Sequence, residues 1–315
     1  MTSSELNLRL TAYIAVRQSL GYGMRAEKTM LADFIRFLEK RGELNPIRGQ
    51  AAFDWATQLE GHRGAGGSAA RLTMARRFLI HLRASYPDTE IPAHGLLATP
   101  RRRIPYLFTD ATIDRLLEAA GENGPRGSLR PHTLTTLLGL LANTGIRAGE
   151  AVRLHIEDVH LEALPPRLLI RETKFRKSRW VPLHATTAYK LASYAAKRKE
   201  LAYDGFSDSF FVSEQGTALR ISNLDHWFRK LALRLGLWPE GEKRWPCLTS
   251  FRHTFAIRRL RTWYEEGADL AILLPHLSVY LGHVSPGETY WYLTATPELL
   301  TAAARRFGQY AGGEQ

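Results

Sequence analysis

Several features common in enzymes and secreted proteins are missing from this sequence of 315 residues. Cys247 is the single cysteine, which excludes an internal disulfide and a zinc cluster of the Cys-x-x-Cys type. The sequence also lacks a Gly-x-x-x-x-Gly-Lys-Ser/Thr loop, a Gly-x-Gly-x-x-Gly turn and a His-Glu-x-x-His motif. Nucleotide hydrolysis, dinucleotide redox chemistry and zincin chemistry are therefore unsupported.

Long apolar runs are missing as well. No apolar stretch reaches the length of a membrane-spanning helix. Residues 1–5 lead directly into an amphipathic pattern, without the basic and then apolar segment of a secretory signal. Together with the single cysteine, these features predict a cytoplasmic protein with no membrane partner.

Positive charge is what the sequence has in excess. It contains 43 Lys and Arg residues against 31 Asp and Glu, which gives a net charge of +12 and a pI near 9.9. Such a balance favours a polyanionic partner, most simply a nucleic acid. A soluble basic protein without such a partner is the alternative. The hydrophobic share of 44% is ordinary for a globular chain long enough for two domains.

Residues 1–98 have the periodicity of a small helical domain. Apolar residues recur at helical spacing from Leu6 to Ile14 and again from Met30 to Leu38, with glycines after each run. The glycine-rich segment 61–67 is expected to be a flexible loop, with the next helix beginning near Ser68. That helix carries basic residues away from its apolar face. We expect them to face DNA rather than only solvent: Arg71, Arg76 and Arg77.

A basic linker is predicted at residues 99–106. Pro100 and Pro105 bracket three arginines, and prolines so placed favour an extended segment. We expect this segment to join two domains and to touch phosphates through its arginines, which are Arg101, Arg102 and Arg103. Residues 107–315 then form the second domain.

In the second domain, an apolar helix over residues 132–142 stops at Gly145, so Arg147 lies at the start of a new helix. Two β-type runs, 168–170 and 180–183, predict a hairpin with a cationic tip. The tip carries Lys174, Arg176 and Lys177. Farther along, a terminal helix is expected to begin at Thr296 and Pro297.

Four blocks in this second domain resemble the tyrosine recombinases, or phage integrase family, which includes Xer, Cre and lambda integrase. Each block alone is a weak signal, but the order and spacing of the four blocks match the family pattern over the whole domain. The amino-acid sequence of the last block is similar to that of integrases of bacterial mobile genetic elements. The blocks are Thr144-Gly-Ile-Arg147-Ala-Gly-Glu150, the hairpin with Lys174 and its Val-Pro-Leu close, Phe251-Arg252-His-Thr-Phe-Ala256, and Leu281-Gly-His283 with Tyr292 nine residues on.

The resemblance implies a mainly α fold with a small β-sheet or hairpin. Residues 1–98 would be a SAM-like core-binding domain, and residues 107–315 an α+β catalytic domain. The implied activity is site-specific DNA recombination, in integration or transposition, on double-stranded DNA at the nucleoid. Because a covalent phosphotyrosyl link stores the energy of the broken bond, no cofactor, ATP or metal is implied.

The resemblance also implies roles for individual residues. Arg147 and Arg252 would bind the non-bridging phosphate oxygens, since guanidinium forks hold phosphate bidentately and stay charged. Tyr292 would be the nucleophile and Lys174 the acid that protonates the leaving 5′-oxygen. His283 would bind the scissile phosphate or orient the tyrosine.

One position departs from the family pattern. Thr249 stands where the family has a histidine, and a hydroxyl donates a hydrogen bond but is no general base near neutral pH. His253 is expected to be structural, because residues i and i+1 of a helix do not share a face. Tyr290 and Tyr280 are expected to pack, which leaves Tyr292 as the nucleophile.

Three other functions remain open. Thr249 motivates the first, a catalytically weak or inactive DNA-binding partner of a sister recombinase. A type IB topoisomerase-like enzyme would share the covalent chemistry, and a helical RNA-binding module would share the charge. For a site-specific recombinase, which is the leading hypothesis, the resemblance implies a homo-tetramer on two DNA sites, assembled through the C-terminal helix.

Overall fold

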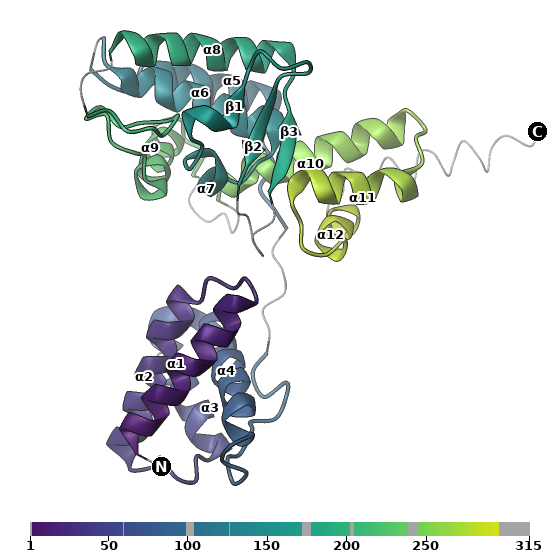
Figure 1. The fold of residues 1–315 in the computed structure, drawn as a ribbon. Helices are drawn as coiled ribbons and strands as arrows, with labels where there is room; N and C mark the ends of the chain where they lie inside the picture. Colours follow the sequence, from purple (N-terminus) through teal and green to yellow (C-terminus); the bar gives the residue numbers. More distant parts are fainter. Residues whose placement is uncertain are drawn as a thin grey trace, which may run out of the picture. The chain divides into compact units, whose positions relative to one another are not determined.

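The computed structural model describes residues 2–58, 60–98, 104–125, 127–171, 178–201, 205–238 and 245–295. The chain divides into two compact units, Met1–Arg103 and Ile104–Gln315, here called the N-terminal and C-terminal units (Figure 1). The predicted fold class is confirmed, because the described residues are mainly helical and carry one small sheet. Of the predicted linker, residues 99–103 lie outside the described residues.

The regular secondary structure in the described part of the N-terminal unit is all helical. Thr2 begins the first helix with a capping box, in which its side chain and that of Glu5 satisfy each other's backbone N–H groups. Large side chains such as Phe34, Trp55 and Phe78 fill a core of the unit's own. The helices are α1 (Ser3–Ser19), α2 (Arg25–Arg41), α3 (Gly49–Thr57) and α4 (Glu60–Arg83).

The prediction of a flexible loop at residues 61–67 is wrong. These residues form the first turns of α4, which begins at Glu60 and not near Ser68. A glycine inside a helix costs only about 1 kcal/mol relative to alanine. The buried Leu72 and Leu79 hold the rest of α4 in the core, and α4 packs against α3. Helix propagation from this packed part therefore outweighs the local preference of the glycines.

In the C-terminal unit, α5, α6 and α8 pack in series, with α6 between the other two (Figure 1). Thr109 begins α5 by accepting a hydrogen bond from the backbone of Thr112. Phe108 packs on Phe251 and so joins the start of the unit to α10. The helices up to that point are α5 (Asp110–Gly121), α6 (Leu129–Thr144), α7 (Ala148–Ala151), α8 (Ala185–Glu200), α9 (Ile221–Arg234) and α10 (Leu248–Glu265), with a 3-10 turn at Ile156–Asp158.

A small antiparallel sheet lies in the same unit. It has the order β1 (Val159–His160), β2 (Arg167–Ile170) and β3 (Arg179–Pro182). Leu168 pairs with Val181, and both are buried, so one face of the sheet joins the core. The pairing of β2 with β3 confirms the predicted hairpin strands. Residues 172–177, which include the predicted cationic tip, lie outside the described residues.

The last described elements are α11 (Leu270–Leu281) and α12 (Gly287–Ala295). They pack with the second half of α10 around a small separate core that contains Leu260, Leu277 and Tyr292 (Figure 1). The predicted terminal helix from Thr296 lies outside the described residues. No helix in the described part of the chain is long and apolar enough to cross a membrane.

Candidate active site

The site begins at the turn after α6, where Arg147 precedes α7. Gly145 ends α6 in the left-handed conformation, with φ of +62°, and this turns the chain sharply toward α7. The Arg147 backbone N–H donates to Glu150 Oε2 at 3.0 Å, and Nη1 donates to Oε1 at 2.9 Å. Nη2 donates to the carbonyl oxygen of Gly282 at 3.1 Å. The side chain is still 37% exposed, so this fixed guanidinium keeps a face toward solvent.

Arg252 lies beside this turn but is buried. Its Nη1 donates to the carbonyl oxygen of Gly145 at 3.0 Å, and its Nη2 donates to that of Leu281 at 2.6 Å. Burial, and then the positive charge of Arg147, lower the pKa of Arg252 from 12.5 to about 10. Among the described residues, no carboxylate forms an ion pair with it. The site thus holds a buried cation that a negative ligand would stabilise.

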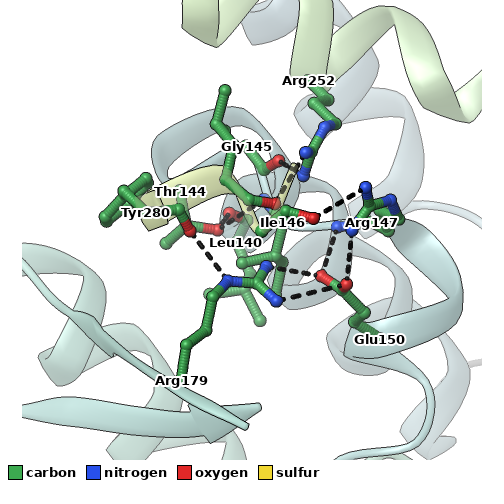
Figure 2. Close-up of polar contacts among 11 residues, drawn as sticks. Leu140, Thr144, Gly145, Ile146, Arg147, Glu150, Arg179, Arg252 and Tyr280 are labelled. Carbon is green, nitrogen blue, oxygen red and sulfur yellow. Dashed lines mark hydrogen bonds and ion pairs between the residues drawn. The ribbon is translucent and has the colours of Figure 1, made fainter. Parts of the chain in front are cut away.

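Glu150 is the carboxylate that organises the cluster. Arg179 of β3 donates to it through Nη2 at 2.8 Å and Nη1 at 3.3 Å, and through Nε to the carbonyl oxygen of Tyr280 at 2.8 Å. Figure 2 shows Arg147 and Arg179 converging on this one carboxylate. Burial raises the pKa of Glu150, but Arg179 and Arg147 outweigh burial and leave the pKa below its ordinary value. Glu150 is therefore ionised, and it ties β3 to α7.

The corner between α11 and α12 carries the aromatic groups. Gly282 ends α11 with φ of +67°, and His283 donates its backbone N–H to Ser278. The ring of His283 is held by Thr289, whose Oγ1 is 2.6 Å from Nδ1. It stacks on Tyr292 with 6.2 Å between ring centroids. Tyr292 is 2% exposed, so the predicted nucleophile is fixed in a packed position.

His253 contacts the hydroxyl of Tyr292. Its Nδ1 lies 3.0 Å from the hydroxyl oxygen, and its ring also meets Trp291 edge-on at 5.7 Å between centroids. Its position next to Arg252 in the sequence predicts a structural role. The two side chains do lie on different faces of α10, but each face meets a different part of the site.

Sequence reasoning missed the positions of His253 and Arg179, although both carry a signal. His253 continues the helical stripe of Ala256, Ile257 and Leu260, which packs against α11 and α12. In β3, Arg179 lies two residues from the buried Val181 and therefore on the same face of the strand. Periodicity thus indicated which face each residue occupies, but not what covers that face.

The other tyrosines of the region have different surroundings. Tyr290 is 46% exposed on α12. Tyr280 stacks on Phe255 with 5.7 Å between ring centroids, and burial raises its pKa to about 12. The hydroxyl of Tyr292 lies 3.0 Å from Nδ1 of His253. Thr249 is exposed in the first turn of α10, one helical turn before His253.

The residues that we predicted to bind DNA are not all on the surface. Arg71 is 4% exposed, lies over the ring of Trp55 at 3.8 Å and donates to its carbonyl oxygen at 3.0 Å. These contacts make Arg71 part of the N-terminal core. Arg76 is partly buried and donates to the carbonyl oxygen of Pro92 at 2.9 Å, while Arg77 is exposed. The remaining candidates lie outside the described residues: Arg101, Arg102, Arg103, Lys174, Arg176 and Lys177.

Chemically, the site joins two guanidiniums to a tyrosine hydroxyl and an imidazole. Guanidiniums favour a phosphate or carboxylate ligand, and a hydroxyl next to an imidazole suits nucleophilic attack. No group of three or more His, Cys, Asp and Glu side chains that could hold a metal ion occurs in the described part of the chain. This combination points to chemistry on an anionic ester.

Comparison with known proteins agrees with this geometry. A family model described as "Phage integrase family" matches residues 107–298. The chain is 40% identical over 299 residues to a putative integrase/recombinase, y4rB, of Sinorhizobium fredii, covering 93% of this chain and 94% of that protein.

Solved structures with low sequence identity share the fold. XerH recombinase bound to a palindromic difH substrate, in a post-cleavage complex, aligns with a TM-score of 0.67 at 20% identity, over 90% of this chain and 79% of that one. The Tn1549 transposon integrase in complex with transposon right-end DNA aligns with a TM-score of 0.66 at 15% identity, over 96% and 98% of the two chains.

Proposed function

We propose that this chain, which belongs to the phage integrase family, cleaves and rejoins double-stranded DNA at specific sites through a covalent 3′-phosphotyrosyl bond to Tyr292. Site-specific recombination is the activity that its family supports. The phosphotyrosyl step and the roles of single residues are inferences from the geometry of the site.

One observation carries the proposal: Arg147 and Arg252 both donate hydrogen bonds to the corner between α11 and α12, the helix that carries Tyr292. Arg252 donates to the carbonyl oxygen of Leu281, and Arg147 donates to that of Gly282. These two carbonyls are consecutive in the chain, and α12 begins at Gly287, five positions after Gly282. An anion held by the two guanidiniums would therefore lie close to the corner that carries Tyr292.

The electrostatics of the pair favour a phosphodiester. The lowered pKa of Arg252 means that burial and the charge of Arg147 destabilise its charged form. A phosphate group between the guanidiniums offsets this destabilisation, and the extra negative charge of the transition state offsets it further. Stabilisation that grows toward the transition state is what accelerates a reaction.

The remaining groups take roles around this step. Tyr292 attacks phosphorus, Lys174 protonates the leaving 5′-oxygen, and the stacked His283 orients the tyrosine. Thr249 donates a hydrogen bond to the phosphate. DNA contacts are proposed for Arg76, Arg77, Arg101, Arg102, Arg103, Arg176 and Lys177, and not for Arg71, because its guanidinium is buried against Trp55. Similar folds have been solved on DNA, which supports DNA as the ligand.

A nicked DNA substrate tests the proposal. A nick next to the cleavage point releases a short fragment after attack, which prevents religation and traps the covalent product. DNA from the flanks of the element that encodes the protein is incubated with wild type, Tyr292→Phe and Tyr290→Phe. We expect a denaturation-resistant adduct on Tyr292, absent in Tyr292→Phe and retained in Tyr290→Phe.

The matched control is informative because Tyr290 is exposed on the same helix, two residues away. Tight DNA binding without any adduct would instead identify a non-catalytic partner of another recombinase. An adduct on Tyr290 would show that the wrong tyrosine has been assigned.

A further inference from the structure

Two consecutive residues of α10 serve different parts of the site. Arg252 donates to the carbonyl oxygens of Gly145 and Leu281, while His253 reaches Tyr292 on α12. Successive side chains of a helix point about 100° apart, because 3.6 residues make one turn. Helix α10 therefore lies between the guanidinium cluster and the nucleophile helix and contributes one side chain to each.

His253 is held in a defined orientation against the nucleophile. Its ring packs edge-on against the rings of Trp291 and Tyr292, at centroid distances of 5.7 and 5.5 Å. Its Nδ1 lies 3.0 Å from the Tyr292 hydroxyl oxygen, which is within the range of a good hydrogen bond. A base at this distance has the geometry required to take the hydroxyl proton.

The other polar groups near Tyr292 are less suited to this task. The Nδ1 of His283 contacts Thr289 Oγ1, and the ring of His283 lies nearly parallel to the tyrosine ring, with an angle of 24° between their planes. That arrangement engages Nδ1 of His283 with Thr289 and orients the ring of Tyr292 by stacking. Thr249 is exposed, and a hydroxyl is no base near neutral pH.

We propose that His253 is a catalytic residue that accepts the proton of the Tyr292 hydroxyl as this oxygen attacks the DNA phosphate. The inference rests on the proposed function, because it requires Tyr292 to be the nucleophile. In cleavage, the Tyr292 oxygen forms a bond to phosphorus, its proton passes to His253 Nδ1, and the bond from phosphorus to the 5′-oxygen breaks. The leaving 5′-oxygen takes a proton from Lys174. In religation, His253 returns its proton to the departing Tyr292 oxygen.

The test compares wild type, His253→Asn and Lys174→Ala in single-turnover adduct formation on the nicked DNA. Asparagine places a polar atom near the position of Nδ1, so it preserves a hydrogen bond to Tyr292 but cannot accept the proton. His276→Asn is the matched control, because His276 is exposed on α11. DNA binding and thermal melting of each variant show whether the fold is intact.

A second substrate distinguishes protonation of the leaving atom from deprotonation of the nucleophile. It carries sulfur in place of the bridging 5′-oxygen, and a thiolate leaves without protonation because a thiol is far more acidic than an alcohol. Loss of the group that protonates the leaving atom is therefore corrected by this substrate. Loss of the group that deprotonates the nucleophile is not.

We expect His253→Asn to slow adduct formation about 100-fold or more, the usual loss of a general base, on both substrates. Lys174→Ala should be slow on the oxygen substrate and near wild type on the sulfur substrate, and His276→Asn should match wild type on both. His253→Asn with a wild-type rate would overturn the inference, as would recovery of this variant on the sulfur substrate. An adduct in wild type that is absent in Tyr292→Phe establishes the proposed function separately, whereas no wild-type adduct overturns both.

Discussion

At the scale of single residues, the site depends on one buried carboxylate. Glu150 receives hydrogen bonds from Arg179 and Arg147, and its side chain is only 3% exposed. Removal of one partner from a buried ion pair leaves the other charge unpaired in a medium of low dielectric. Glu150 therefore stabilises the fold and at the same time orients the half-buried guanidinium of Arg147.

Glu150→Gln should lower the free energy of unfolding by about 3 kcal/mol at neutral pH, because it leaves the buried Arg179 without a countercharge. Urea denaturation measures this loss. The control is Glu200→Gln, whose exposed ion pair with Lys197 should contribute less than about 1 kcal/mol. Equal losses in the two variants would contradict the assigned role of Glu150.

The difference in stability between wild type and Glu150→Gln should depend on pH. The pKa of Glu150 is lower in the folded protein than its ordinary value of 4.5, so its ionised form stabilises the fold. This contribution is complete above the ordinary pKa and is lost as the pH falls through the lowered one. The stability difference between wild type and Glu150→Gln should thus be constant near neutral pH and shrink below pH 4.5. A difference that grows on acidification would have the wrong sign.

At the scale of elements, the end of α11 positions the site. Gly282 has φ of +67°, and a Cβ at this position would lie 2.7 Å from Nη1 of Arg179. The carbonyl oxygen of Gly282 also accepts the hydrogen bond of Arg147. A side chain here would therefore disturb both arginines that bind Glu150.

Gly282→Ala should slow adduct formation about tenfold or more, which corresponds to about 1.4 kcal/mol of barrier. Gly267→Ala is a close control, because Gly267 also follows a helix, α10, and has positive φ, +76°, but has no heavy atom within 4 Å of the added Cβ. Both variants should lose about 1 kcal/mol of stability from the left-handed conformation. Only Gly282→Ala should also cleave more slowly, and equal cleavage rates in the two variants would refute this role of α11.

At the scale of the whole molecule, two units with separate cores share one chain and a net charge of +12. Each unit buries large side chains of its own, such as Trp55 in one and Phe211 in the other. We expect residues 1–98 and residues 104–315 to fold when they are produced separately. A cooperative thermal transition of each fragment would show this.

The full chain should bind its DNA site at least about tenfold more tightly than either fragment, because one contact raises the effective concentration of the other unit. Equilibrium binding of the two fragments and the full chain measures this gain. Equal affinity of the fragment 104–315 and the full chain would mean that the N-terminal unit does not contact the DNA.

Assembly on DNA is the other prediction at this scale. We propose that residues 297–315 join protomers into a tetramer on two DNA sites. A chain that ends at residue 296 should still bind a single site but fail to form the complex of paired sites in a gel-shift assay. Paired complexes that persist after this deletion would contradict the proposal.

The sequence by itself determined the helical class, the hairpin strands and the order of the blocks that carry Arg147, Arg252, His283 and Tyr292. The helices and strands follow from local information, since helical and strand periods and glycine caps depend on residues a few positions apart. The blocks were recognised by their resemblance to a known family. Even here, local information erred at residues 61–67, where packing of α4 extended a helix through the glycines.

Tertiary structure alone decided what each side chain touches. Arg71 and Arg77 look alike in the sequence, yet the first is buried against Trp55 and the second is exposed. The hydrogen bond from Arg147 to Gly282 joins residues 135 positions apart, and the contact of His253 with Tyr292 joins residues 39 positions apart. Periodicity indicates which face of an element a residue occupies, whereas the neighbour on that face comes from a distant part of the chain. The resemblance to a known family singled out Tyr292, whereas local spacing could not show that His253 lies at its hydroxyl.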